Sequence, residues 1–285
     1  MKKFFKIVVA SLAVVILAAG CSSNSNKEEQ KKESNIYRSL DEIKKSGSIK
    51  IGVFSDKNPF GYIDEKGAYK GYDVNLAERL AKDLGVKPEY ISTEPANRVE
   101  YLKSGKVDLI LANFTVTEER KQAVDFALPY MKVSLGIVSP DKALITSPEQ
   151  LKGKKLIVAK GTTAETYFTK NYPDVQLVKF DQYTETFNAL IDGRGDALST
   201  DNTEVLAWAL KNKGFTVGVD TLGDVDPIAP AVAKGNKELL DWINEEIKTL
   251  GKEQFVHKDY EENLAPVYGS SVDPNSIVVE GGVVK

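Results

Sequence analysis

The chain has 285 residues and a mass of 31.3 kDa, which is enough for one large or two small domains with a sizeable core. Its formal net charge of −3 excludes a nucleic-acid-binding protein, because phosphate binding needs a basic field. Cysteine and histidine occur once each, at Cys21 and His257. An internal disulfide and a zinc site built from several cysteines or histidines are therefore excluded, and we expect no metal and no cofactor.

The first twenty residues have the pattern of an export signal. A basic start precedes an uncharged, mainly apolar run at 7–19, which is too short to span a bilayer comfortably. Small residues then precede Cys21, and this end of the run resembles the lipobox of bacterial lipoproteins, with Ala18 in place of the usual leucine. The resemblance implies cleavage after a signal peptide at 1–20 and lipidation of Cys21; the alternative is a buried free thiol.

The next segment is polar and carries almost no apolar side chains. Residues 22–36 read SSNSNKEEQKKESNI and cannot bury enough surface to offset the entropy of ordering. We therefore expect a flexible, lipidated tether over 21–36 and a folded domain from Tyr37.

The folded domain alternates predicted strands and helices. Apolar runs predict strands at 48–54, 107–112, 155–159, 175–180 and 197–200. Helical periodicity predicts helices at 73–84, 97–104, 164–171, 184–191, 203–211 and 237–250. This alternation indicates an α/β fold with mostly parallel sheets.

Local signals predict where several helices begin and end. Asn97 and Glu100 have the spacing of a capping box, and Asn236 stands at the start of the last long helix. Gly85 and Gly251 stand at the ends of two helices, where a glycine readily adopts the left-handed conformation.

A first candidate ligand residue, Arg120, follows the buried strand 107–112. Thr117 is the expected N-cap of the next helix, which places Arg120 in its first turn. In an open α/β sheet, ligands bind beyond the carboxyl ends of the strands. The guanidinium would then hold a carboxylate in a bidentate fork; the alternative is a solvated arginine.

Two further candidates follow other strands. Strand 155–159 leads through Gly161, Thr162 and Thr163 into a helix, whose first N–H groups form an anion seat unless the threonines are only caps. Asp201 follows strand 197–200 and is either an N-cap or the acceptor for an ammonium group. A guanidinium, an anion seat and an acid at strand ends together indicate a receptor for a zwitterion.

Longer motifs resemble a known family, the extracytoplasmic solute-binding proteins of ABC importers in their polar amino-acid branch. The resemblance covers about residues 37–280 and rests on four stretches: PFGYIDEKGAYKGYDVNLA (59–77), ANRVEYLKSGKVDLILANFTVTEERKQAVDF (96–126), KGTTAETYF (160–168) and GDALSTDNTEV (195–205). The segments at 97–115, 129–136 and 251–264 are most similar to a cysteine-binding member.

The resemblance implies a role for each candidate in holding the two charged groups of an amino acid. Arg120 matches the arginine that grips the α-carboxylate, and Thr163, beside Thr162, matches a donor to the same group. Asp201 matches the acid that pairs with the α-ammonium, and the backbone carbonyl of Asn113 matches its second acceptor.

The remaining candidates concern contact with the ligand and its side chain. Thr115 matches a hydroxyl residue that contacts the ligand, and Arg98 matches a position that can face its side chain. Phe54 and Lys57 match positions in the first loop that help to select the side chain. An acid stands at the place of Phe54 in binders of cationic amino acids, so the resemblance favours a neutral polar or anionic side chain.

The resemblance also implies a fold and a domain organisation. The expected fold is the two-lobed type II periplasmic-binding-protein fold, in which two α/β lobes are joined by two hinge strands. Lobe 1 would comprise 37–132 and 227–285, and lobe 2 would comprise 133–226. A ligand lying between the lobes would stabilise their closure.

The leading hypothesis is a monomeric receptor that is anchored outside the cytoplasm by lipidated Cys21. It would bind a free L-amino acid and deliver it to the membrane permease of an ABC importer. L-Cysteine is the first candidate ligand, cystine the second, and glutamate or aspartate the third. The alternative classes are a dehydratase-like enzyme on the same scaffold, with Asp201 or His257 as acid or base, and a surface adhesin.

Overall fold

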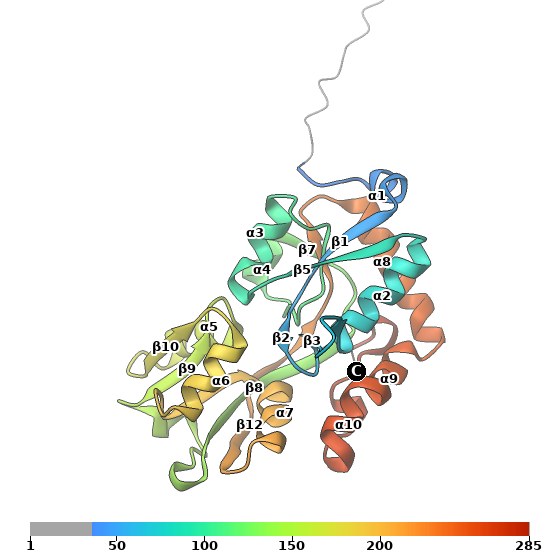
Figure 1. The fold of residues 1–285 in the computed structure, drawn as a ribbon. Coiled ribbons are helices and arrows are strands. Elements are labelled where there is room, and N and C mark those ends of the chain that lie inside the picture. Colours follow the sequence, from blue (N-terminus) through green and yellow to red (C-terminus); the bar gives the residue numbers. More distant parts are fainter. Residues whose placement is uncertain (1–35, 285) are drawn as a thin grey trace, which may run out of the picture. The chain divides into compact units, whose positions relative to one another are not determined.

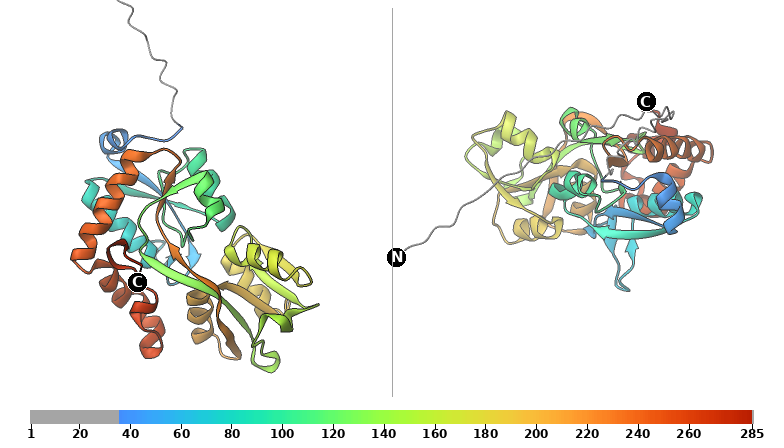
Figure 2. Two further views of the ribbon diagram at one scale, coloured as in Figure 1. Left: turned by 180° about the vertical axis from the view of Figure 1, so that it is seen from behind. Right: turned by 90° about the horizontal axis from the view of Figure 1, so that it is seen from above.

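The computed structural model of the chain describes residues 36–284. Two five-stranded sheets organise these residues, and a small three-stranded sheet accompanies them (Figures 1 and 2). We call each large sheet together with its helices a lobe. The predicted signal peptide, Cys21 and all of the predicted tether except Ile36 lie outside the described residues. Within 36–284, no helix has the length and apolar character that crossing a lipid bilayer requires.

The sheet of the first lobe has the strand order β5-β1-β6-β13-β7. Its strands are β1 (Ser48–Val53), β5 (Lys87–Ser92), β6 (Leu109–Ile110), β7 (Val124–Phe126) and β13 (Ala231–Ala233). β1 pairs parallel with β5 and β6, whereas β13 pairs antiparallel with β6 and β7. The sheet is therefore mixed. The parallel pairing of β1, β5 and β6 agrees with the mostly parallel sheet that the sequence predicts, whereas β13 is antiparallel.

Helices cover both faces of this first sheet (Figure 1). α2 and α8 bury their apolar stripes with Ile49 and Ile51 of β1, whereas α3 packs Leu102 with Ile110 of β6 on the other side. The helices of this lobe are α1 (Leu40–Ser46), α2 (Tyr72–Leu84), α3 (Arg98–Lys103), α4 (Glu118–Ala123), α8 (Lys237–Lys252), α9 (Phe255–Asp259) and α10 (Ala265–Tyr268). Burial on two faces explains the continuous apolar run around β6.

The second lobe repeats the same arrangement with the strand order β10-β9-β11-β8-β12. Its strands are β8 (Met131–Pro140), β9 (Lys155–Ala159), β10 (Gln176–Phe180), β11 (Ala197–Asp201) and β12 (Phe215–Ile228). β9 pairs parallel with β10 and β11, and β8 pairs antiparallel with β11 and β12.

Side chains of β9 alternate between two packing layers of this lobe. Leu156 and Val158 pack with α5 (Thr163–Asn171), whereas Ile157 packs with α6 (Tyr183–Ile191) and α7 (Asn202–Lys211). The period of two follows from strand geometry. Because β9, β10 and β11 are parallel, their carboxyl ends lie at one edge of the sheet, where Gly161 follows β9 and Asp201 ends β11.

β8 and β12 carry the chain between the lobes. They pair antiparallel from Met131 with Ile228, at the first lobe, to Val138 with Val217 within the second sheet. These strands supply the two connections that the resemblance implies. The expected lobe limits at 132/133 and 226/227 fall inside both strands, which continue through those points without a break, so the exact limits stay a prediction.

The small sheet consists of β2 (Asp56–Lys57), β3 (Gly61–Ile63) and β4 (Tyr69–Lys70), paired antiparallel in that order. It follows β1 directly in the sequence and places Lys57 beside the second lobe, where the ammonium contacts Asp201.

Two expectations about helix ends are wrong, and a third holds in part. Asn97 caps nothing, because its amide donates to Glu94 and a 3-10 turn (Pro95–Asn97) precedes α3. Asn236 stands at the N-cap position of α8, as predicted, but its amide donates to the carbonyl of Arg38 and makes no cap. Gly251 lies inside α8, where a Cβ would come within 2.4 Å of the Cα of Gly281. The predicted end at Gly85 is confirmed by its left-handed conformation.

Candidate functional site

Arg120 lies in the first turn of α4 and turns back over the end of the buried strand. Thr117 is the N-cap, as predicted, and its Oγ1 accepts from the backbone N–H of Arg120 at 3.2 Å. The guanidinium donates from Nη1 to the carbonyl of Thr115 at 2.8 Å and from Nη2 to the carbonyl of Gly161 at 2.9 Å. Gly161 belongs to the second lobe, so this arginine bridges the lobes and is not a solvated side chain.

Arg98 lies beside the same carbonyl and is almost fully buried. It donates to the carbonyls of Pro95, Ala112 and Asn113, each at 3.0 Å, and to that of Gly161 at 3.2 Å. In residues 36–284, neither Arg98 nor Arg120 forms an ion pair with a carboxylate.

Burial disfavours the charged form of both guanidinium groups. Burial lowers the pKa of Arg98, and burial together with the positive charge of Arg98 lowers the pKa of Arg120 to about 9. A bound anion would offset the cost of burying these cations, so the pair suits an anionic ligand group.

The loop before α5 supplies the second-lobe side of the anion site. Gly161 has a φ of +75°, and its Cβ, if present, would come within 2.5 Å of the Cα of Ala96 in the first lobe. Thr162 is the N-cap of α5: its hydroxyl accepts from the N–H of Glu165 and donates to the carbonyl of Ala159. Thr163 is the first residue of α5 and lines the cavity described below.

Asp201 accepts an ammonium group, but that group belongs to Lys57. The Nζ of Lys57 lies 2.9 Å from Asp201 Oδ2, 3.1 Å from Glu204 Oε2 and 3.3 Å from the Tyr183 hydroxyl. Asp201 stands at the N-cap position of α7 without capping it. Its Oδ1 makes no hydrogen bond within residues 36–284 and is available to a second donor.

Two carboxylates and one hydroxyl surround the Lys57 ammonium inside the protein. Burial alone would lower the pKa of Lys57, yet the carboxylates of Asp201 and Glu204 hold that pKa well above its ordinary value. Burial raises the pKa of Glu204 to about 7, although Lys57 opposes the shift. The Lys57 ammonium also lies 4.5 Å from the ring centroid of Tyr183 and 5.6 Å from that of Phe54.

Asn113 and Thr115 lie in the buried segment between β6 and α4. Asn113 has a φ of 40°, its N–H donates to Asp73 at 2.9 Å, and its carbonyl accepts from Arg98. Burial raises the pKa of Asp73 to about 6. The carbonyl of Thr115 accepts from Arg120. A carbonyl oxygen has two lone pairs, so both carbonyls keep an acceptor position besides the guanidinium they hold.

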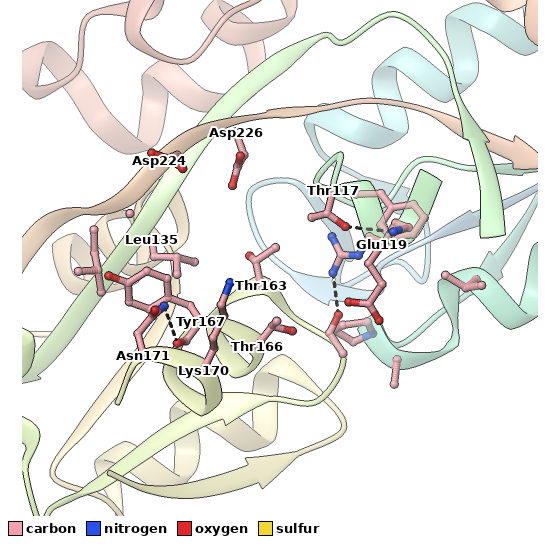
Figure 3. Close-up of a pocket in the computed structure, with 18 residues that line it drawn as sticks. Thr117, Glu119, Leu135, Thr163, Thr166, Tyr167, Lys170, Asn171, Asp224 and Asp226 are labelled. Atoms are coloured by element: carbon pink, nitrogen blue, oxygen red, sulfur yellow. Dashed lines mark hydrogen bonds between the residues drawn. The ribbon is translucent and has the colours of Figure 1, made fainter. Parts of the chain in front are cut away.

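A cavity of about 520 Å³ is lined by residues from both lobes (Figure 3). Among the nine predicted ligand residues, Arg120 and Thr163 line it. The other seven are not part of its lining, and all of them are buried: Phe54, Lys57, Arg98, Asn113, Thr115, Thr162 and Asp201. The structure therefore brings the predicted residues to one region around the interlobe hydrogen bonds, and their individual roles stay predictions.

Sequence reasoning missed two groups of this region, Tyr183 and Glu204. The T-shaped contact between the rings of Tyr183 and Phe54, with centroids 5.3 Å apart, crosses from one lobe to the other. Glu204 follows Asp201 by three residues, a spacing that puts two side chains on one face of a helix turn. That spacing is the signal that could have identified it.

A comparison with family models matches residues 49–264 to the bacterial extracellular solute-binding proteins, family 3. The chain belongs to this family. Two solved structures are similar to this solute-binding protein. The solute receptor for L-cysteine of Neisseria gonorrhoeae is 55% identical, with a TM-score of 0.84, and the similarity covers 85% of this chain and 100% of that one. The cysteine-binding protein from Campylobacter jejuni is 54% identical, with a TM-score of 0.83, and the similarity covers 85% and 98%.

The ABC transporter glutamine-binding protein GlnH of Bacillus subtilis (strain 168) is 34% identical over 255 residues, which are 88% of this chain and 93% of that protein. The resemblance on which the fold prediction rests is thus confirmed, and so is the type II periplasmic-binding-protein fold. The solute-binding protein acts outside the cytoplasm, as its family does.

Within residues 36–284, no cluster of histidine, cysteine, aspartate and glutamate could hold a metal ion. His257 does not line the cavity; its Nδ1 lies 2.7 Å from Glu280. The arrangement of charges suits binding of a small charged molecule.

Proposed function

We propose that this solute-binding protein captures a free L-amino acid, L-cysteine first, and delivers it to the membrane permease of an ABC importer. The observation that carries the proposal is the pair of guanidinium groups of buried Arg98 and half-buried Arg120, which lack a carboxylate partner in residues 36–284. Asp201, with one free carboxylate oxygen, lies on the other lobe. This charge pattern complements an α-carboxylate and an α-ammonium.

The α-carboxylate would bind Arg120 and the hydroxyl of Thr163. A guanidinium offers five N–H donors, and Arg120 uses two of them on backbone carbonyls. The α-ammonium would then bind Asp201 Oδ1, while Lys57 retains Oδ2. A single zwitterion would in this way join residues of both lobes and stabilise the closed form.

Side-chain selectivity would come from Phe54 and Lys57. Lysine and arginine are disfavoured, because Phe54 stands where the resemblance places an acid in binders of cationic amino acids. The two solved structures above 50% identity are described as binding cysteine, which supports L-cysteine ahead of the alternatives. Cystine is the second candidate, and glutamate or aspartate the third.

The same proposal covers the anchorage and organisation of the chain. Cys21 would carry the lipid after removal of residues 1–20, and 21–36 would tether a monomeric binding domain to the cell membrane. The proposed lobes comprise 37–132 with 227–285, and 133–226. A dehydratase-like activity would need a general acid or base at the cavity, and His257 is paired with Glu280 elsewhere.

A thermal-shift panel of the twenty L-amino acids and cystine tests the function. A ligand that binds only the native state raises Tm, by mass action. We expect L-cysteine, under reducing conditions, to give the largest shift. A panel without any shift would contradict the proposal.

A further inference from the structure

We propose that the outer part of the cavity is a second subsite, which takes the distant amino and carboxylate groups of a two-headed amino acid such as cystine. The inference rests on the proposed function, because the first head must bind at Arg120 and Asp201. The subsite is formed by Lys170 on α5 and by Asp224 and Asp226 on β12.

The first argument is the extent of the cavity. Its volume of about 520 Å³ lies in the range of about 300–1,000 Å³ that holds drug-sized ligands, whereas cysteine is among the smallest amino acids. From Arg120 and Thr163 the lining continues along α5 to Thr166 and Lys170. A single small amino acid would leave this outer part empty.

The second argument is the charge on the two outer walls. In Figure 3 the amino end of Lys170 points from α5 toward β12, and the carboxylate of Asp226 points from β12 toward α5. None of Lys170, Asp224 and Asp226 forms an ion pair within the described residues 36–284. The walls thus present an unpaired cation and two unpaired carboxylates to the same space.

The third argument is the burial of Asp226 and the charge beside it. Burial raises the pKa of its carboxyl, and the neighbouring charge of Asp224 raises it further. A half-buried carboxylate beside a second, exposed carboxylate favours an ammonium partner. A second α-ammonium would meet this demand, and its carboxylate would pair with Lys170.

Apolar surface in the same cavity suits the link between the two heads. Leu135, Leu222 and Tyr167 line it together with the charged residues. A disulfide or thioether chain is apolar and would pack on these side chains. The ligand class is therefore an α-amino acid that carries a second α-amino-acid head on a short sulfur-containing chain.

Calorimetry with the full-length chain tests the outer subsite. L-Cysteine, S-methyl-L-cysteine and lanthionine are titrated in reducing buffer, because lanthionine is a two-headed thioether that cannot be reduced; cystine is titrated without reductant. The variants are D224N/D226N and Lys170→Met. The matched control is Asp220→Asn, which removes a carboxylate from the same strand but lines a different cavity.

We expect the wild type to bind lanthionine and cystine more tightly than S-methyl-L-cysteine. Each outer-site variant should lose about tenfold in affinity for the two-headed ligands, which is the size expected for one lost charge-assisted contact, and keep its affinity for L-cysteine. Asp220→Asn should change neither the affinity for the two-headed ligands nor the affinity for L-cysteine. The proposal is contradicted if the two-headed ligands bind no more tightly than S-methyl-L-cysteine. It is also contradicted if the outer-site variants bind the two-headed ligands as tightly as the wild type does. If L-cysteine itself fails to bind the wild type, the proposed function is at fault.

Discussion

Arg98 and Arg120 share the carbonyl of Gly161, yet their hydrogen bonding suggests different tasks. Arg98 makes four hydrogen bonds to carbonyls and lies at 2% exposure, so most of its donors are engaged. Arg120 makes two such bonds and lines the cavity. We infer that Arg120 holds the ligand and that Arg98 positions the loops around it.

Replacing Arg120 by alanine should weaken amino-acid binding about 100-fold or more. Loss of one partner from a desolvated charge pair costs about 2–5 kcal/mol of binding free energy. Isothermal calorimetry with L-cysteine measures the loss. Arg194→Ala removes an arginine that stacks on Phe180 at the surface, and it should leave the affinity unchanged. Equal affinity of Arg120→Ala and the wild type would reject the carboxylate role.

Glu204 should make the stability of the protein depend on pH. Its pKa lies at about 7 in the folded chain, against an ordinary value of 4.5, because burial favours the neutral acid. The folded state then binds more protons than the unfolded state between these values. The stabilising contribution is complete below about pH 4.5 and is lost as the pH rises through about 7.

The variant Glu204→Gln isolates this effect. Relative to the wild type, its free energy of unfolding should rise between pH 5 and pH 8, by at most about 3 kcal/mol. Urea denaturation at both pH values gives the difference, and the exposed Glu185→Gln serves as control. A difference between wild type and variant that stays constant with pH would contradict the burial argument.

At the scale of elements, the loop 160–163 shows how adjacent residues divide structural and binding roles. The hydroxyl of Thr162 is engaged on both sides, with the N–H of Glu165 and the carbonyl of Ala159. Thr163 lines the cavity and caps nothing. Of the two threonines in the predicted anion site, only Thr163 has a hydroxyl that could bind an anion. The hydroxyl of Thr162 already caps α5.

Valine variants of the two threonines should separate these roles. Thr162→Val should lower the free energy of unfolding by about 1–2 kcal/mol, as for loss of an N-cap, and keep the affinity for L-cysteine nearly unchanged. Thr163→Val should keep the stability and weaken binding about three- to tenfold, as for one hydrogen bond. Chemical denaturation and calorimetry are run on both variants. Swapped or identical effects would contradict the assignment.

What the sequence predicts well is local in the chain. The strands predicted at 155–159 and 197–200 correspond to β9 and β11. Thr117 caps α4, because the N–H group that it accepts belongs to Arg120, three residues later. The side-chain contact of Asn236 and the continuation of α8 through Gly251 are not predicted, because the contacting residues, Arg38 and Gly281, lie far away in sequence. No local pattern could show this.

The same limit applies to the candidate site. The motif positions identify Arg120 and Asp201, but the contact between Lys57 and Asp201 joins residues 144 positions apart. Neither residue carries a local sign of the other. The family resemblance predicts that Lys57 and Asp201 both lie near the ligand. The ion pair between them is visible only in the folded structure.

For the whole molecule, the contact between the lobes includes a close backbone approach. Gly161 of the second lobe lies against Ala96 of the first, where a Cβ would come within 2.5 Å of the Ala96 Cα and 2.8 Å of its nitrogen. Backbone atoms cannot move aside as a flexible side chain can. The glycine therefore permits both the approach and the two guanidinium bonds to its carbonyl.

Gly161→Ala should impair closure without unfolding the protein. We expect the affinity for L-cysteine to fall about 100-fold, whereas the positive φ should cost about 1–2 kcal/mol of stability. Gly153→Ala is the matched control, because Gly153 has a φ of +73° and no neighbour within 4 Å of its Cβ position. The control should show a similar stability loss with normal binding. Loss of binding in both variants, or in neither, would contradict the role of close approach.

The most direct test of the binding site is a crystal structure of the protein with L-cysteine. The predicted result is one ligand between the lobes, its carboxylate within hydrogen-bond distance of Arg120 and Thr163 and its ammonium on Asp201. A ligand bound elsewhere, or an Arg120 guanidinium directed into solvent with no contact to the ligand, would contradict the account.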